Sequence, residues 1–267
     1  MLTTILDPQA KEFYCHTLSV FARAKLPVLI GGAYAFARYT GIERHTKDFD
    51  VFVREMHFLE TLEALKAAGY STEATFPHWL GKAFHGEFFV DVIFGSGNGI
   101  ARVDDGWFLH GPPDRIFDVP VQLCPPEEMI WSKAFVQERE RFDGADVVHL
   151  IKSWGPHLDW QRLVRRFGSH WQVLLSHLVL FDYVYPGERD AVPGWLRSEL
   201  QRRLSETLSS PLPKERSCRG TLLSRQQYLY DIERQGYRDV RRQADNPMTD
   251  DEIATWTAGI ARDGSRE

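Results

Sequence analysis

The stretch over residues 28–52 constrains the fold of this chain more than any other part of the sequence. A short apolar strand runs into the pair Gly31-Gly32, a helix follows, and a second apolar strand carries Asp48 and Asp50. Residues two apart in a strand lie on the same face of a sheet, so these two carboxylates point the same way. Like charges on one face repel each other unless a cation lies between them. The pattern therefore predicts a divalent cation at a sheet face, next to a glycine turn.

A third carboxylate, Asp91, lies in the middle of the apolar run 87–94. A charge in such a run must be paired, bound to a metal or placed at a cleft. If the strands of Asp50 and Asp91 are neighbours, all three carboxylates meet in one place. Two of them would then hold metal ions and the third would take the proton from an attacking hydroxyl, which is the two-metal arrangement for in-line displacement at phosphorus. We expect Asp48, Asp50 and Asp91 to be both the catalytic residues and the ligands of Mg²⁺ or Mn²⁺.

The glycine pair is the second candidate element of a phosphate site. Gly31 and Gly32 allow close approach of phosphate oxygens to the backbone, and the N-terminus of the helix that follows favours anions. A Gly-Gly turn by itself is usually only a turn, and Asp-x-Asp alone is also common. The ordered set of strand, Gly-Gly, helix, Asp-x-Asp strand and later lone Asp is far more specific.

Bulk composition excludes several classes of protein. No apolar run reaches the ~20 residues of a membrane span, and residues 1–4 do not resemble the start of a signal peptide. Three cysteines without metal-ligand spacing indicate a reducing compartment, so we expect a cytoplasmic protein. The formal charge of −5 does not favour nucleic acid as a partner, although that partner class stays open.

The pair Pro125-Pro126 marks the expected domain boundary, because strand patterns nearly vanish after it. We expect an α+β domain over residues 1–125 and an all-helical domain over residues 126–267. Periodicity predicts these elements: strands at 28–30, 49–53, 70–76, 78–85, 87–94 and 119–123, and helices at 8–25, 33–40, 56–68, 126–138, 143–154, 159–167, 169–184, 194–207, 221–240 and 249–258, with a loop over 208–220.

The motif set over residues 25–95 resembles the DNA polymerase β-like nucleotidyltransferase superfamily. The resemblance implies a mixed, mostly antiparallel sheet flanked by helices in residues 1–125, with the helical domain over residues 126–267 closing a nucleotide cleft. It also implies the transfer of a nucleoside monophosphate from a nucleoside triphosphate to an acceptor hydroxyl. The interval between Gly32 and Asp48 is longer than in compact members. Together with the run Arg44-x-Thr46-x-Asp48-Phe49-Asp50, it looks more like the AbiEii-type bacterial nucleotidyltransferases, which include toxins of toxin–antitoxin pairs.

The helical half is also similar to AbiEii-type and related bacterial nucleotidyltransferase-like proteins. A lysine on a helix, Lys133, is followed by arginines and by the spacing Asp143-x-x-Asp146. The resemblance implies that Lys133 contacts nucleotide phosphates and that Asp146 orients Lys133 or the base. Asp143 is equally suited to be the N-cap of the next helix. Arg44 is expected either to contact phosphate or to be a solvated charge beside the strand.

Three alternatives stay open at this point. The acceptor can be a small molecule, or a tRNA or protein as in a toxin-type enzyme, with a cognate antitoxin as partner. A non-catalytic nucleotide-binding protein that keeps the fold is a second class, but it has no need of a third buried carboxylate. A sugar-nucleotide glycosyltransferase would use Asp-x-Asp as well, but it predicts a doubly wound sheet and a larger chain.

Overall fold

The computed structural model of the chain describes residues 7–44, 46–243 and 247–259. Residues 1–4, on which the expectation about a signal peptide rests, lie outside these ranges. Contacts within the chain divide it into two compact units, residues 1–125 and residues 126–267. Each unit is described by itself below.

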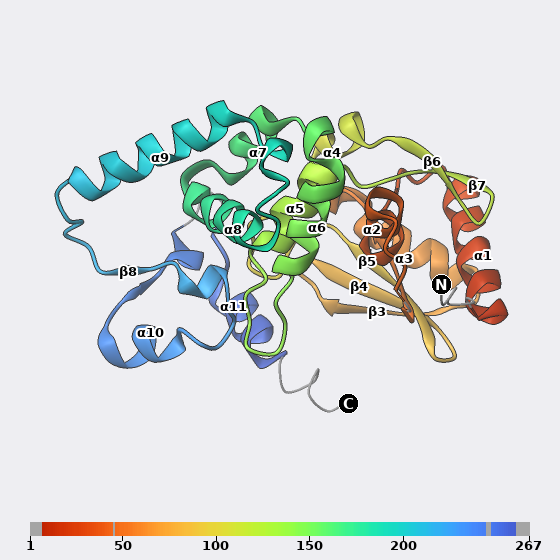
Figure 1. The fold of residues 1–267 in the computed structure, drawn as a ribbon. Coiled ribbons are helices and arrows are strands. Elements are labelled where there is room, and N and C mark those ends of the chain that lie inside the picture. The colour runs from red at the N-terminus through yellow and green to blue at the C-terminus, as the bar shows by residue number, and fades with distance from the viewer. Residues whose placement is uncertain (1–6, 45, 244–246, 260–267) are drawn as a thin grey trace. The chain divides into compact units, whose positions relative to one another are not determined.

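The first unit is built on a five-stranded mixed sheet with the strand order β1-β2-β5-β4-β3. Figure 1 shows its strands β5, β4 and β3 side by side. The central strands β2 and β5 are parallel, and the other neighbouring pairs are antiparallel. This arrangement confirms the predicted mixed, mostly antiparallel sheet. The strands are β1 (Leu29–Ile30), β2 (Asp48–Phe52), β3 (Ser71–Phe76), β4 (Leu80–His85) and β5 (Phe88–Ile93).

Four helices accompany this sheet: α1 (Pro8–Ala24), α2 (Gly32–Thr40), α3 (Phe58–Ala67) and α4 (Asp105–His110). Helix α1 begins where Asp7 accepts a hydrogen bond from the Gln9 amide at 2.8 Å, and it ends at Lys25 in the left-handed conformation. The short helix α4 is not among the helices that the sequence predicted. Asp104 caps α4 by accepting a hydrogen bond from the Gly106 amide.

A separate hairpin follows, made of β6 (Pro113–Ile116) and β7 (Val119–Gln122). Only β7 was predicted. The two-residue turn between the strands consists of Phe117 and Asp118, with φ angles of 52° and 65°. Positive φ at both turn residues is the type I′ geometry, whose twist matches that of the flanking strands.

The alternating burial of β2 explains how this strand carries two acids. Phe49 and Val51 are fully buried, while Asp48, Asp50 and Phe52 are only half-buried. The ring of Tyr14 from α1 stacks on Phe49, with centroids 4.9 Å apart and planes 17° apart. The apolar face of β2 is therefore fixed against α1, and its other face is left for Asp48 and Asp50.

The second unit is mainly helical, as predicted. Its helices are α5 (Pro126–Ala134), α6 (Gly144–Trp154), α7 (Trp160–Phe167), α8 (Trp171–Val184), α9 (Gly194–Ser209), α10 (Leu229–Gln235) and α11 (Asp250–Ala258). Two short strands, β8 (Ser217–Cys218) and β9 (Arg238–Asp239), pair in parallel, so the expectation of an all-helical region was too simple. The single helix expected over 221–240 was wrong, because α10 ends at Gly236 with φ of 71° and the chain then enters β9.

A buried ion network ties α5 to α7 in this unit. Arg162 lies between Glu127 and Glu128, with its Nη1 atom 2.6 Å from Oε1 of Glu128. Arg166 contacts the same carboxylate at 3.0 Å, and Glu128 is fully buried. Buried charges of this kind persist only when they are paired. In the described part of the chain, no helix combines the length and apolarity that a membrane span requires.

We expect Arg162→Met to lower the free energy of unfolding by ~3–5 kcal/mol, because it leaves buried carboxylates without their main partner. Urea unfolding followed by circular dichroism measures this loss. Arg202→Met is the control, because Arg202 forms exposed ion pairs within α9 and its loss should leave the urea midpoint nearly unchanged. Equal effects of the two substitutions would contradict a structural role for the buried network.

Candidate functional site

The structure brings the three predicted carboxylates together at the centre of the sheet. Asp48 and Asp50 share one face of β2, and Asp50 is the register partner of Asp91 on the parallel strand β5. One carboxylate oxygen from each residue lies within 4.8 Å of those of the other two. Asp91 is buried and the other two are half-buried. The cluster thus places three carboxylates close together in a partly buried position.

The glycine turn gives this cluster its space. Gly32 has φ of +53°, and a Cβ atom there would lie 1.7 Å from Oδ2 of Asp50. A Cβ atom on Gly31 would lie 2.2 Å from the ring of Phe52. The Gly31 amide donates to the backbone carbonyl of Asp50 at 3.0 Å, so it belongs to the sheet's own hydrogen bonding. Asp50 and Phe52 can lie this close to the turn only because Gly31 and Gly32 have no Cβ atom. Contact of the two glycines with phosphate stays a prediction.

Hydroxyl groups hold the start of β2 in place. Thr46 donates a hydrogen bond to Oδ1 of Asp48, and Tyr14 donates to the carbonyl oxygen of Lys47 at 2.9 Å. Burial is the larger cause, and the nearby Asp48 carboxylate the smaller one, that raises the pKa of Tyr34 well above its ordinary value. Burial and the surrounding acids do the same to the pKa of Tyr14. Both phenols are therefore protonated hydrogen-bond donors at neutral pH.

Lys82 is the functional candidate that the sequence analysis missed. It lies opposite Asp91 in the antiparallel pair of β4 and β5, and its Nζ atom is 2.6 Å from Oδ1 of Asp91. The two side chains are 14% and 12% exposed. The ammonium also lies 4.0 Å from the ring centre of Phe89. Only the register of β4 against β5 shows this pairing, and a lone lysine in a strand does not predict it.

The cluster fits a divalent metal ion by the chemistry of its donors. All three side chains offer carboxylate oxygens, the ligands that hard cations such as Mg²⁺ prefer. The ammonium of Lys82 offsets one of the three charges. The residues that could hold a metal ion are therefore Asp48, Asp50 and Asp91.

Lys133 and Asp146 belong to the second unit, where they form an ion pair of 2.8 Å between Nζ and Oδ2. Lys133 also lies 3.2 Å from Oδ2 of Asp143. Arg141 binds Asp143 through two hydrogen bonds of 2.8 Å each. Asp143 stands at the N-cap position of α6, but its side chain makes no capping hydrogen bond, so the expected capping role is wrong. Lys133 is thus held between two carboxylates.

The pKa of Asp143 reflects two opposing effects. Burial is the largest single influence and disfavours the charged form, but the hydrogen bonds from Arg141 and the charge of Lys133 outweigh it. Together they hold the pKa of Asp143 below its ordinary value of 3.8.

Arg44 lies in the loop between α2 and β2, and its guanidinium carbon is 4.4 Å from the ring centre of Phe36. The same loop carries Thr46, which contacts the acid cluster. Arg44 lines a cavity together with Tyr34 and Thr46. The contact of Arg44 with nucleotide phosphate stays a prediction.

Solved structures similar to this chain include the following three. The lincosamide antibiotic adenylyltransferase LnuA, bound to lincomycin, matches with a TM-score of 0.39 and 16% identity, over 54% of this chain and 96% of that chain. ANT(2'')-Ia in complex with adenylyl-2''-tobramycin matches with a TM-score of 0.40 and 15% identity, over 73% and 99% of the two chains. An antigenic nucleotidyltransferase-like protein from Paracoccidioides brasiliensis matches with a TM-score of 0.42 and 14% identity, over 70% and 95%.

At TM-scores below 0.5, these likenesses carry no argument about this chain. No protein-family description and no curated protein matches the sequence. The closer resemblance to AbiEii-type proteins stays a prediction. The function proposed below therefore rests on the side chains of this chain.

We expect Lys82→Met to lower the melting temperature in the presence of EDTA, because it leaves the carboxylate cluster without its nearby positive charge. Excess Mg²⁺ should then raise the melting temperature of this variant by more than that of the unchanged protein. Differential scanning calorimetry measures both shifts. Lys47→Met is the matched control, because Lys47 forms an exposed pair with Glu87. An equal response to Mg²⁺ in all three proteins would show that Lys82 does not act on the cluster.

The pH dependence of stability tests the arrangement around Asp143. Because its pKa is lower in the folded protein than in the unfolded chain, the ionised carboxylate stabilises the fold at every pH above 3.8. This contribution disappears as the pH falls through the folded-state pKa. We expect Asp143→Asn to be less stable than the unchanged protein at neutral pH, with a difference that narrows below 3.8. Urea unfolding across this range measures it, and a difference that is independent of pH would contradict the assignment.

Proposed function

We propose that this protein is a metal-dependent nucleotidyltransferase that moves a nucleoside monophosphate from a nucleoside triphosphate to an acceptor hydroxyl. The single observation that carries the proposal is the convergence of Asp48, Asp50 and Asp91 beside the turn at Gly31 and Gly32. The repulsion among three carboxylates makes it costly in free energy to bring them together. A function that uses their charge is therefore favoured over a purely structural role.

Each residue has a role in this proposal. Asp48, Asp50 and Asp91 would hold Mg²⁺ or Mn²⁺, and the ion would neutralise charge on the phosphates when bound. Gly31 and Gly32 would seat the phosphates at the start of α2, with Arg44 as a further phosphate contact. The roles expected for Lys133 and Asp146 in the second unit belong to the same proposal.

The proposed step is an in-line displacement at the α-phosphorus. Asp91 accepts the proton of the acceptor hydroxyl, the acceptor oxygen forms a bond to the α-phosphorus, and the bond from that phosphorus to the bridging oxygen breaks. Pyrophosphate leaves with the bonding electrons. The hydrogen bond from Lys82 to Oδ1 of Asp91 orients this carboxylate. Its other oxygen then accepts the proton.

The proposal is tested by incubating the protein with labelled ATP, CTP, GTP or UTP in the presence of total RNA and cell extract, and by identifying the molecule that acquires label. We expect Asp48→Asn, Asp50→Asn and Asp91→Asn each to reduce label transfer by about a hundredfold or more. Each variant should stay folded, and in Asp48→Asn and Asp50→Asn the loss of mutual repulsion should raise the melting temperature.

Asp105→Asn is the control for these variants, because Asp105 is 90% exposed and pairs with Arg54 outside the cluster. It should leave transfer unchanged. Undiminished transfer by the variants at Asp48 and Asp50 would remove both residues from the mechanism. Absence of metal-dependent nucleotide binding, measured by calorimetry, would instead favour an interaction protein of the same fold.

A further inference from the structure

A row of charged residues crosses the sheet through the carboxylate cluster. Asp50 on β2 is the register partner of Asp91 on β5. On its other side Asp91 is paired with Lys82 on β4, and Lys82 is in turn paired with Glu73 on β3. Register partners on neighbouring strands share a face of the sheet, and the strands are about 4.8 Å apart. The row therefore places one positive charge directly beyond the last acid of the cluster.

Lys82 has a carboxylate on either side in this row, and it binds Asp91. Its Nζ atom donates to Oδ1 of Asp91 at 2.6 Å, whereas Glu73 is exposed and accepts a hydrogen bond from Thr75 at 2.9 Å. The ammonium also lies 4.0 Å from the ring centre of Phe89, and the side chain is 14% exposed. A cation between a carboxylate and an aromatic face is attracted by both. The charge of Lys82 is therefore held in place at the edge of the cluster.

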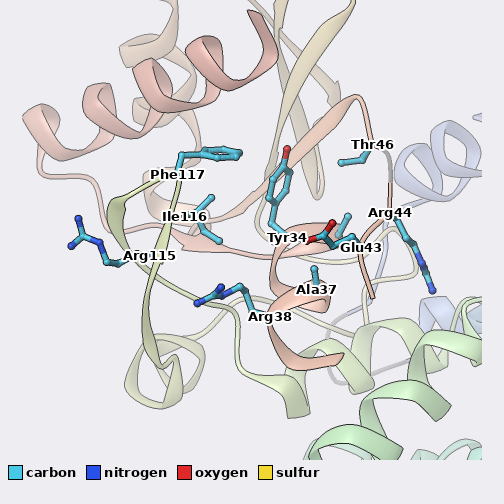
Figure 2. Close-up of a pocket in the computed structure, with 10 residues that line it drawn as sticks. Tyr34, Ala37, Arg38, Glu43, Arg44, Thr46, Arg115, Ile116 and Phe117 are labelled. Carbon is cyan, nitrogen blue, oxygen red and sulfur yellow. The ribbon is translucent and has the colours of Figure 1, made fainter. Parts of the chain in front are cut away.

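The face of β2 opposite to the acids is apolar. There the rings of Tyr34 and Phe117 pack against Phe49, with centroids 5.1 and 6.4 Å from that of Phe49. Figure 2 shows the rings of Tyr34 and Phe117 on this side of the sheet. Within the part of the chain that the structure describes, the carboxylate cluster is the one place where three candidate metal ligands meet. Divalent ions that bind the first unit are therefore expected on the acid face, beside Lys82.

The charges on this face balance with one divalent ion. The three carboxylates and the ammonium together leave two negative charges, and Mg²⁺ or Mn²⁺ carries two positive ones. Enzymes that use two metal ions hold them ~3.5–4 Å apart, so a second ion in the cluster would also need Asp91. It would then approach an ammonium that already lies 2.6 Å from the same carboxylate. Like charges at such short distances repel each other strongly where solvent is partly excluded.

We propose that Lys82 takes the place of a second metal ion, so that the cluster holds one divalent ion and transfer proceeds with that ion alone. This inference rests on the proposed function, and it replaces the two-metal arrangement that the sequence predicts. Lys82 is a positioning residue in this scheme. It supplies a fixed positive charge and occupies Oδ1 of Asp91, which leaves the other oxygen of that carboxylate for the acceptor hydroxyl.

The test counts Mn²⁺ ions on the protein in the presence of a nucleotide that cannot react. The α,β-methylene analogues of ATP, CTP, GTP and UTP are used in turn, because a carbon bridge between the α- and β-phosphorus blocks the release of pyrophosphate. Equilibrium dialysis gives the number of ions retained per protein. Electron paramagnetic resonance shows whether two Mn²⁺ ions lie close enough for their spins to couple. We expect the unchanged protein to retain a single, isolated ion.

Two variants at Lys82 separate its charge from its bulk. Lys82→Met keeps an unbranched side chain without the ammonium, and Lys82→Arg keeps the positive charge. We expect Lys82→Met to retain a second ion and to show a spin-coupled pair, and Lys82→Arg to retain one ion. Lys47→Met is the matched control, because Lys47 forms an exposed pair with Glu87, and it should also retain one ion. Circular dichroism and the melting temperature show whether each variant is folded.

The outcomes separate this inference from the function on which it rests. If the unchanged protein retains no Mn²⁺ with any of the four analogues, the proposed function itself fails. If the unchanged protein holds a spin-coupled pair of ions, Lys82 does not replace a metal, and the proposed function stands without this inference. That measurement needs no variant. A folded Lys82→Met protein that still holds a single, isolated ion overturns the inference as well, because the ammonium is then not what excludes the second ion.

Discussion

Mutual repulsion among Asp48, Asp50 and Asp91 is the constraint on which the rest of the first unit depends. One carboxylate oxygen from each of them lies within 4.8 Å of those of the other two, on one sheet face. Two features make this tolerable: the ammonium of Lys82 beside Asp91, and the space that Gly32 leaves for Asp50. The opposite face of β2 is packed against α1 through Phe49, so the strand cannot turn its acids away. The fold therefore holds a strong negative potential in a fixed place, as a cation-binding centre requires.

Much of this architecture could be predicted from local patterns. The alternation of apolar and acidic residues in β2 and the lone acid in β5 led to the correct strands and to the expectation that three acids meet. The mixed sheet itself was expected from the resemblance of these motifs to a known superfamily. Helix α4 and strand β6 escaped prediction because both are short and lie among glycine and proline residues. The helix expected over 221–240 was wrong because the left-handed Gly236 ends α10 and lets the chain form β9.

Contacts set by strand register could not be predicted in the same way. Lys82 and Asp91 are nine residues apart in sequence and face each other only because β4 and β5 pair as they do. The turn between β6 and β7 places Phe117 in a left-handed conformation that its side chain disfavours. Lys133, Asp143 and Asp146 were singled out from spacing, but their mutual ion pairs emerged only in three dimensions. Sequence patterns thus located the charged groups, while the tertiary structure decided which of them pair.

The parallel pairing of β2 with β5 makes the chain unequally tolerant of insertions. Side chains alternate between the two faces of a strand, so one extra residue within β5 before Asp91 would turn its carboxylate into the apolar layer and bring Val90 or Val92 to the cluster instead. The turn between β3 and β4 lies outside this register, and added length there is absorbed by the loop. Natural length variation in proteins of this architecture should therefore concentrate in the turns and spare the two central strands.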